Sequence, residues 1–202
     1  MSEGRLFVVS GPSGTGKGTI CRALLGAERL ALSVSMTTRP ARPGETDGVS
    51  YHFVSRAEFV SMIKDGEFLE YAEVYGNYYG TPKKKVLAKL KDGADVILEI
   101  DIQGAMQVKK LYQNAILIFI LPPSMAELKE RITGRGSETE SDIKLRMGKT
   151  LEEIECIKNY DYFVVNNELE EAVARLKAII TAEHSRVAED INTVIEKYKE
   201  EI

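Results

Sequence analysis

The sequence predicts an α/β fold of three layers, in which helices cover both faces of a mostly parallel sheet. Two observations predict it. Four short, β-branched-rich apolar runs are each followed by a turn signal and a helical pattern, which is typical of right-handed βαβ units. These runs are residues 6–10, 96–100, 116–121 and 162–165. A glycine-rich turn also follows the first run, at residues 11–16.

The helices of these units are expected to begin near Gly16, Gln103, Ser124 and Leu169. The last of them has apolar residues at i, i+3, i+4 and i+7, which indicates one buried face. That face consists of Leu169, Ala172, Val173, Leu176, Ile179 and Ile180. A further helix is predicted in the final residues by the same spacing, packed either on the core or on a partner subunit.

Two segments interrupt the βαβ rhythm. Residues 35–84 have Pro and Gly punctuation, alternation suited to antiparallel strands and a helical stretch at 56–64, which together predict a small α/β insertion. Residues 125–155 place a Gly-flanked arginine loop between two helices, and Ser137 with Glu140 has capping-box spacing. We therefore expect a single domain whose core is residues 1–34, 85–124 and 156–202, with 35–84 inserted and 125–155 as a helical lid.

Composition excludes several classes of protein. The chain of 202 residues carries a formal charge of −4, which argues against broad binding to nucleic acid or to an anionic membrane. No apolar run approaches the ~20 residues that span a bilayer, and the N-terminal run is too short for a secretory signal. The two cysteines, Cys21 and Cys156, fall in helical patterns and are expected to be small buried hydrophobes. We expect a cytoplasmic protein with neither nucleic acid nor membrane as partner, and a homo-oligomer stays open.

The turn after the first run has the spacing of a phosphate-binding loop. Four residues separate Gly11 from Gly16, and Lys17 follows at once. Small residues let the backbone curl so that successive N–H groups face an anion, and the helix that follows adds the positive end of its dipole. Lys17 supplies a mobile cation for phosphoryl groups. The alternative is a turn that binds nothing, but the preceding strand and following helix favour the phosphate site.

Gly18 departs from the usual motif, because a magnesium-binding Ser or Thr normally stands there. Thr19 is adjacent but points about 100° away around a helix, so it is a poor substitute. Magnesium is then expected to be held mainly by phosphates and water, with carboxylates behind the water.

The loop, together with "SVSMTTRPARPGE", "FLEYAEVYGNYYGT", "ILEIDIQG" and "GRGSETE", resembles guanylate kinase from about Leu6 to Asn167. The resemblance implies a P-loop nucleoside-monophosphate kinase that uses Mg²⁺ and moves the γ-phosphoryl of ATP to GMP, and also to dGMP, in purine nucleotide metabolism and GMP recycling. It makes residues 35–84 a GMP-binding insertion. It implies that ATP is bound by Gly11, Pro12, Ser13, Gly14, Thr15, Gly16, Lys17, Gly18 and Thr19, and that Asn166 or Asn167, with Asn167 preferred, contacts adenine.

Arg39 and Arg42, stiffened by Pro40 and Pro43, can present two guanidinium forks to one phosphate. By themselves they are more often surface charges. The resemblance makes them ligands of the GMP phosphate, joined by the hydroxyls of Tyr51 and Tyr79.

Guanine recognition requires an acceptor that faces N1–H and the 2-amino group, and a carboxylate meets both. The resemblance selects Glu70 for this role over Glu67 and Glu73, with Ser35 and Thr81 as hydroxyls against the base. The alternative for Glu70 is an outward-facing strand residue.

Glu99 and Asp101 end the strand "VILEID" on one face, at the edge where open α/β sheets bind ligands. The resemblance places Glu99 near the metal through water and Asp101 near the acceptor nucleoside. The alternative is that these two acids only cap the helix that follows. Lys17 and three arginines, Arg131, Arg135 and Arg146, are implied as catalytic. Arg146 could instead pair with Asp142 along a helix.

Two other functions are compatible with parts of this pattern. A non-catalytic binding module of the same fold typically loses parts of the phosphate loop, whereas Gly11, Gly16 and Lys17 are present here. A kinase of the same superfamily with another acceptor, such as AMP or a sugar phosphate, is separable by comparing acceptors.

Overall fold

The computed structural model describes residues 3–25, 30–74, 76–133, 140–187 and 191–201, with the backbone alone at 132–133 and 140–146. It has a five-stranded parallel sheet in the order β2-β7-β1-β8-β9. Its strands are β1 (Leu6–Ser10), β2 (Leu30–Leu32), β7 (Asp95–Glu99), β8 (Ile116–Leu121) and β9 (Tyr162–Val165). The predicted α/β class and mostly parallel sheet are confirmed.

Helices cover both faces of this sheet. On one face α3 (Lys83–Lys91) and α4 (Ile102–Leu111) pack through residues such as Val86, Leu90 and Val108. On the other, α1 (Lys17–Leu24) and α7 (Leu169–His184) pack through Ile20, Leu24 and Leu176. The apolar face predicted for α7 lies wholly within or against this second cluster. The three layers follow because every central strand has apolar side chains on both sides.

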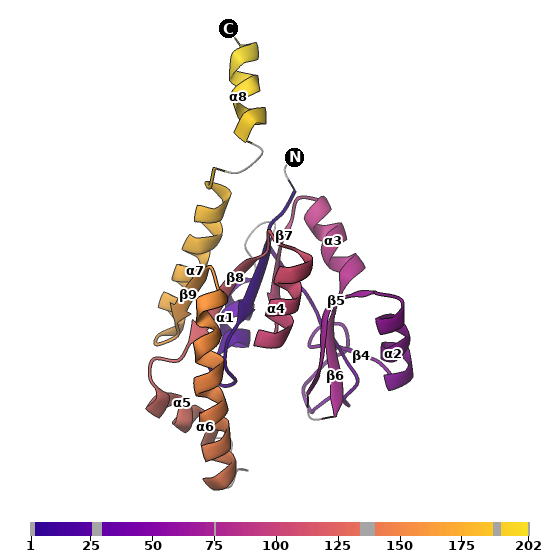
Figure 1. Cartoon of the computed structure of the whole chain (residues 1–202), viewed down its shortest axis with the longest axis vertical. Helices are drawn as coiled ribbons and strands as arrows, with labels where there is room; N and C mark the ends of the chain where they lie inside the picture. The colour runs from indigo at the N-terminus through magenta and orange to yellow at the C-terminus, as the bar shows by residue number, and fades with distance from the viewer. Residues whose placement is uncertain (1–2, 26–29, 75, 134–139, 188–190, 202) are drawn as a thin grey trace.

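The insertion forms a second sheet in the order β4-β3-β6-β5. Its elements are β3 (Met36–Thr37), β4 (His52–Phe53), α2 (Arg56–Lys64), β5 (Phe68–Val74) and β6 (Asn77–Pro82). Phe59 of α2 stacks on Phe68 at 4.3 Å between ring centroids, which gives the insertion its own small core. Figure 1 shows the insertion and the pair α5 (Met125–Thr133) and α6 (Glu140–Glu155) on opposite sides of the core.

Several predictions about elements need correction. The strand β2 was missed, because three half-buried residues carry too little pattern to show a period. β3 and β4 pair in parallel, and only β3–β6 and β5–β6 are antiparallel, so the antiparallel prediction holds for part of the insertion. Cys21 is fully buried as predicted, but Cys156 lies half-exposed in a short 3₁₀ helix, η1 (Cys156–Asn159). Ser137 lies outside the described residues.

The final predicted helix is α8 (Ile191–Glu200), and none of its residues is buried. Figure 1 shows it projecting beyond the core, so the alternative in which it packs on the core is not seen. No helix in the described part of the chain is long and apolar enough to cross a membrane.

The parallel strands all end at one edge of the sheet. In register, Val9 of β1 lies beside Glu99 of β7, and Ser10 lies beside Phe119 of β8. The segments after β1, β7, β8 and β9 therefore meet at this edge, which is where open α/β sheets place ligands.

Candidate active site

The glycine-rich turn joins the central strand β1 to α1. Gly16 caps α1 with φ of 84°, a left-handed conformation that favours glycine. A Cβ on Gly16 would also lie 2.4 Å from Asn166 Nδ2, so both backbone and space require glycine. Thr15 is buried, and its hydroxyl donates to the carbonyl of Pro12 at 2.9 Å. The turn is thus held from inside by its own residues.

Lys17 crosses this turn. Its Nζ donates to the carbonyl oxygens of Gly11 at 2.6 Å and Pro12 at 2.8 Å. Burial lowers the pKa of Lys17, and the nearby carboxylates of Glu99 and Glu153 oppose that shift. The ammonium group is therefore placed against the backbone of the loop.

Asn166, directly after β9, supports the turn from the end of a strand that lies two positions from β1 in the sheet. It is buried, and its Nδ2 donates to the carbonyl of Thr15 at 2.7 Å. Arg131 of α5 donates to the backbone carbonyl of Asn166 at 3.3 Å and pairs with Glu127. Asn167 is exposed. Of the two asparagines, Asn166 is therefore the one that the structure binds to the loop.

Glu99 ends β7 beside the first turn of α1. A Cβ on Gly18 would lie 3.0 and 3.2 Å from the two carboxylate oxygens of Glu99. Burial raises the pKa of Glu99, whereas the charges of Lys17 and Arg22 lower it. No group of three or more His, Cys, Asp or Glu side chains that could hold a metal is present in the described ranges.

Glu70 lies on the wall between the insertion and the core. Only 5% of its surface is exposed, and its Oε1 accepts a hydrogen bond of 2.6 Å from Thr81 Oγ1. Its Oε2 would lie 2.7 Å from a Cβ on Gly104, so the glycine in α4 makes room for the carboxylate. Burial raises the pKa of Glu70 to about 7, against the hydrogen bond from Thr81, while the charge of Asp101 adds to the rise.

Asp101 stands at the N-cap of α4 and is exposed. Its carboxylate accepts from the backbone N–H of Gly104 at 2.7 Å. The helix-capping alternative is therefore present for Asp101. It does not exclude a ligand role, because a carboxylate has lone pairs for further donors.

Arg39 is held by a partner that the sequence analysis did not single out. Both of its terminal nitrogens donate to Glu45 at 2.6 Å, and its guanidinium lies 5.1 Å from the ring centroid of Tyr51. Hydrogen bonds from Arg39 and from the backbone of Arg42 lower the pKa of Glu45 to about 2. The pairing with Glu45 and the contact with Tyr51 thus fix the orientation of the Arg39 guanidinium on the insertion.

The remaining predicted acceptor residues lie around Arg39. The rings of Tyr51 and Tyr79 meet edge to face at 5.9 Å, and both are half-buried. Ser35 is half-buried, and its carbonyl accepts from the backbone of His52 at 2.9 Å. The side chain of Arg42 is exposed.

Part of the predicted lid cannot be placed. Arg135 lies outside the described residues, and so does the side chain of Arg146, together with its suggested pairing to Asp142. The described part of α6 does contribute to the site. Glu153 is half-buried, its pKa is raised by burial, and it interacts electrostatically with Lys17.

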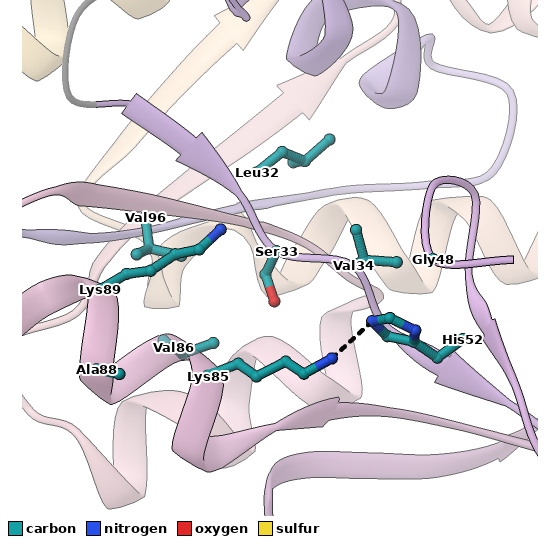
Figure 2. A pocket seen from close by; sticks show the side chains of 10 residues that line it. All are labelled: Leu32, Ser33, Val34, Gly48, His52, Lys85, Val86, Ala88, Lys89 and Val96. Atoms are coloured by element: carbon teal, nitrogen blue, oxygen red, sulfur yellow. Dashed lines mark hydrogen bonds between the residues drawn. The ribbon is translucent and has the colours of Figure 1, made fainter.

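A separate cavity of about 460 Å³ lies behind the connection between core and insertion. Figure 2 shows its lining, in which Lys85 of α3 hydrogen-bonds His52 of β4 at 3.0 Å, opposite Ser33 and Val34. None of the predicted site residues lines it. The cavity is therefore distinct from the site, and the Lys85–His52 contact joins the core to the insertion across it.

Sequence reasoning missed four residues of this site: Glu45, Gly104, Glu153 and the loop-supporting role of Asn166. Glu45 stands six residues after Arg39, and Gly104 three after Asp101, so local spacing carried a weak signal for both. Glu153 and Asn166 are distant from the loop in sequence, and only the fold brings them to it.

The site combines a glycine loop after the central strand of a parallel sheet, a lysine at the end of that loop, and a separate insertion with a paired arginine. Together these features define the class of P-loop phosphotransferases. The model of the guanylate kinase family matches residues 3–183. The chain belongs to the guanylate kinase family.

Individual relatives agree with this assignment. The chain is 50% identical over 203 residues to guanylate kinase of Clostridioides difficile strain 630, covering 100% of this chain and 99% of that protein. It is 56% identical over 187 residues to guanylate kinase of Clostridium tetani, covering 93% and 90%. The crystal structure of guanylate kinase from Anaplasma phagocytophilum is similar with a TM-score of 0.80 and 35% identity, covering 96% of this chain and 95% of that one.

Proposed function

We propose that this protein transfers the γ-phosphoryl group of ATP to GMP, giving ADP and GDP, and that it accepts dGMP as well. The observation that carries the acceptor assignment is the buried carboxylate of Glu70 between the insertion and α4. Family membership and an intact phosphate loop support the donor assignment. The reaction belongs to purine nucleotide metabolism, in the cytoplasm.

The donor phosphates lie in the loop of residues 11–16 and against the N-terminus of α1. Backbone N–H groups there face the anion, and the α1 dipole adds to the attraction. Lys17 turns from the carbonyls of Gly11 and Pro12 to the phosphoryl oxygens. Asn166 keeps the Thr15 carbonyl in place, and Asn167 faces adenine.

The acceptor is held at both ends. The Glu70 carboxylate accepts from N1–H and the 2-amino group of guanine, with Thr81 and Ser35 beside it, while Asp101 faces the nucleoside. Arg39 and Arg42, with the hydroxyls of Tyr51 and Tyr79, bind the GMP phosphate. Arg39 exchanges Glu45 for that phosphate without leaving the ring of Tyr51. A guanidinium can pair through two hydrogen bonds with a carboxylate or with a phosphate, so the exchange of partners needs little movement of the Arg39 side chain.

Catalysis requires no side-chain nucleophile. The acceptor oxygen is brought in line with the γ-phosphorus when the insertion and the 125–155 lid close, and cations neutralise the charge that spreads over the equatorial oxygens. Lys17, Arg131, Arg135 and Arg146 are the cations proposed. The residues present also suit Mg²⁺ bound with ATP, because Glu99 places a carboxylate beside the loop that could hold the ion's water ligands. That ion would neutralise the β- and γ-phosphate oxygens.

A coupled ADP-release assay with GMP, dGMP, AMP and UMP tests the proposal. We expect turnover with GMP and dGMP, and discrimination against AMP that can reach ~10⁴-fold because adenine leaves the buried carboxylate without donors. Lys17→Ala should abolish turnover, and Glu70→Gln should weaken the use of GMP selectively. Lys110→Ala, an exposed lysine of α4, is the matched control for charge. Equal rates on AMP and GMP would overturn the guanine assignment.

A further inference from the structure

Gly18 has no conformational reason to be glycine. It lies in the first turn of α1 and is not among the glycines with positive φ. Glycine is a poor helix former compared with alanine or serine. A reason must therefore come from the space around it.

That space is filled by Glu99. A Cβ at position 18 would lie 3.0 Å from Oε1 and 3.2 Å from Oε2 of Glu99, and 3.2 Å from Nη1 of Arg22. These separations are shorter than ordinary van der Waals contact. A serine or threonine hydroxyl, which extends one bond further, would compete with the carboxylate for the same volume.

The position of Glu99 is set by the sheet. Glu99 is the last residue of β7 and lies in register with Val9 of β1, one strand from the loop. Burial raises the pKa of its carboxyl, and the charges of Lys17 and Arg22 oppose that rise. The N-terminus of α1 further stabilises a negative charge there. The two oxygens of Glu99 therefore lie beside the first turn of α1, next to the phosphate loop.

We propose that Gly18 and Glu99 act as a matched pair, in which the Glu99 carboxylate takes the place of the loop hydroxyl as a direct ligand of the divalent cation bound with the donor nucleotide. This differs from the expectation of a carboxylate acting through water. It rests on the proposed function only in that the donor is a metal-bound nucleoside triphosphate. Carboxylate oxygens are preferred ligands of Mg²⁺, so the exchange of hydroxyl for carboxylate keeps a hard ligand.

The pair is tested by titrating a non-hydrolysable ATP analogue by calorimetry, once with Mg²⁺ and once with EDTA. The ratio of the two dissociation constants is the gain in affinity due to the metal. Glu99→Gln should lower this gain by roughly 10-fold or more, while binding in EDTA stays equal or tightens, because a negative charge facing phosphate is removed. A merely structural role would instead weaken binding under both conditions. Glu152→Gln, an exposed carboxylate of α6, is the control.

A double-mutant cycle provides the second arm. Gly18→Ser and Glu99→Asp should each lower the metal gain, the first by crowding and the second by shortening the ligand. Together they should restore it to within ~3-fold of wild type, since the shorter acid leaves room for the hydroxyl. This double-mutant cycle tests the proposal even if the Glu99→Gln variant does not fold.

Two results would overturn the pair while leaving the proposed function intact. One is an undiminished metal gain in Glu99→Gln, and the other is strict additivity in the cycle, each in protein that still phosphorylates GMP. Failure of the wild type to bind the analogue under either condition would instead overturn the donor site and the pair with it.

Discussion

Thr81 Oγ1 donates a 2.6 Å hydrogen bond to Oε1 of Glu70, inside a wall where Glu70 is almost fully buried. Burial raises the pKa of this carboxyl to about 7, and the Thr81 bond works against that rise. The Thr81 hydroxyl thus favours the ionised form of Glu70 near neutral pH. Because only the ionised form offers two acceptors to guanine, this relationship links acceptor affinity to pH.

Thr81→Val should raise the pKa of Glu70 further, because the hydrogen bond that favours the charged form is lost. We expect KM for GMP at pH 7 to increase roughly 10-fold, with KM for ATP little changed. The increase should shrink at pH 9, where Glu70 ionises in both proteins. Thr181→Val, at an exposed hydroxyl of α7, is the control. An increase that is the same at both pH values would contradict this mechanism.

Glu70→Gln should change how stability depends on pH. The folded pKa of about 7 lies above the ordinary 4.5, so the folded wild type binds more protons than the unfolded chain between these values. Its free energy of unfolding therefore falls as pH rises through this window. Glutamine does not titrate, so the free energy of unfolding of the variant should rise relative to that of the wild type between pH 4.5 and 7. The relative rise should reach up to about 3 kcal/mol. Urea denaturation of both proteins at pH 5 and pH 8 measures the difference, and a constant difference would show that Glu70 has no raised pKa.

Arg39→Lys should raise KM for GMP by ~10- to 100-fold, because lysine keeps the charge but loses the planar fork. The fork now pairs with Glu45 through two bonds of 2.6 Å, and the same geometry fits a phosphate. Arg56→Lys is the matched control, since Arg56 pairs with Glu73 on the exposed side of the insertion. Steady-state kinetics with GMP and ATP varied separately make the comparison. Equal effects of the two substitutions would argue against a phosphate role for Arg39.

Asn166→Ala should weaken ATP binding and leave GMP binding unchanged. The side chain donates to the Thr15 carbonyl at 2.7 Å, and its loss leaves that carbonyl without its partner and the loop less well held. We expect KM for ATP to rise roughly 10-fold, with a melting temperature lower by a few degrees. Asn159→Ala, at an exposed asparagine of η1, should change neither. A rise in KM for GMP alone would contradict the assignment.

Elements with many residues were predictable, and short ones were not. β1, β8, β9 and α2 have the predicted bounds, and α7 begins at the predicted residue, because runs of four or more apolar residues, or two turns of a helix, carry a measurable period. β2 has three residues, and β3 and β4 have two each. Their existence depends on pairing with distant strands, so the sequence around them holds little sign of it.

The same division holds within the site. Position and spacing alone indicated the phosphate loop, since Gly11, Gly16 and Lys17 lie within seven residues of the chain. The partner of Arg39 also lies nearby in the chain, but that Glu45 is this partner depends on geometry that spacing does not give. Asn166 can support the loop because β9 pairs with β8, which in turn pairs with β1, so that both β1 and β9 end at the same edge of the sheet.

By itself, the order of residues determined the sheet-and-helix alternation, the anion-binding turn and the set of polar groups available for two nucleotides. These are local properties, set by side-chain period and backbone freedom over a few residues. Only the tertiary structure decided which groups are buried and which meet. It placed Glu70 against Gly104 and Thr81, and Glu99 against Gly18, although each pair is separated by many residues in the chain or by a change of element. Burial and electrostatics depend on distances through space, and those exist only once the chain has folded.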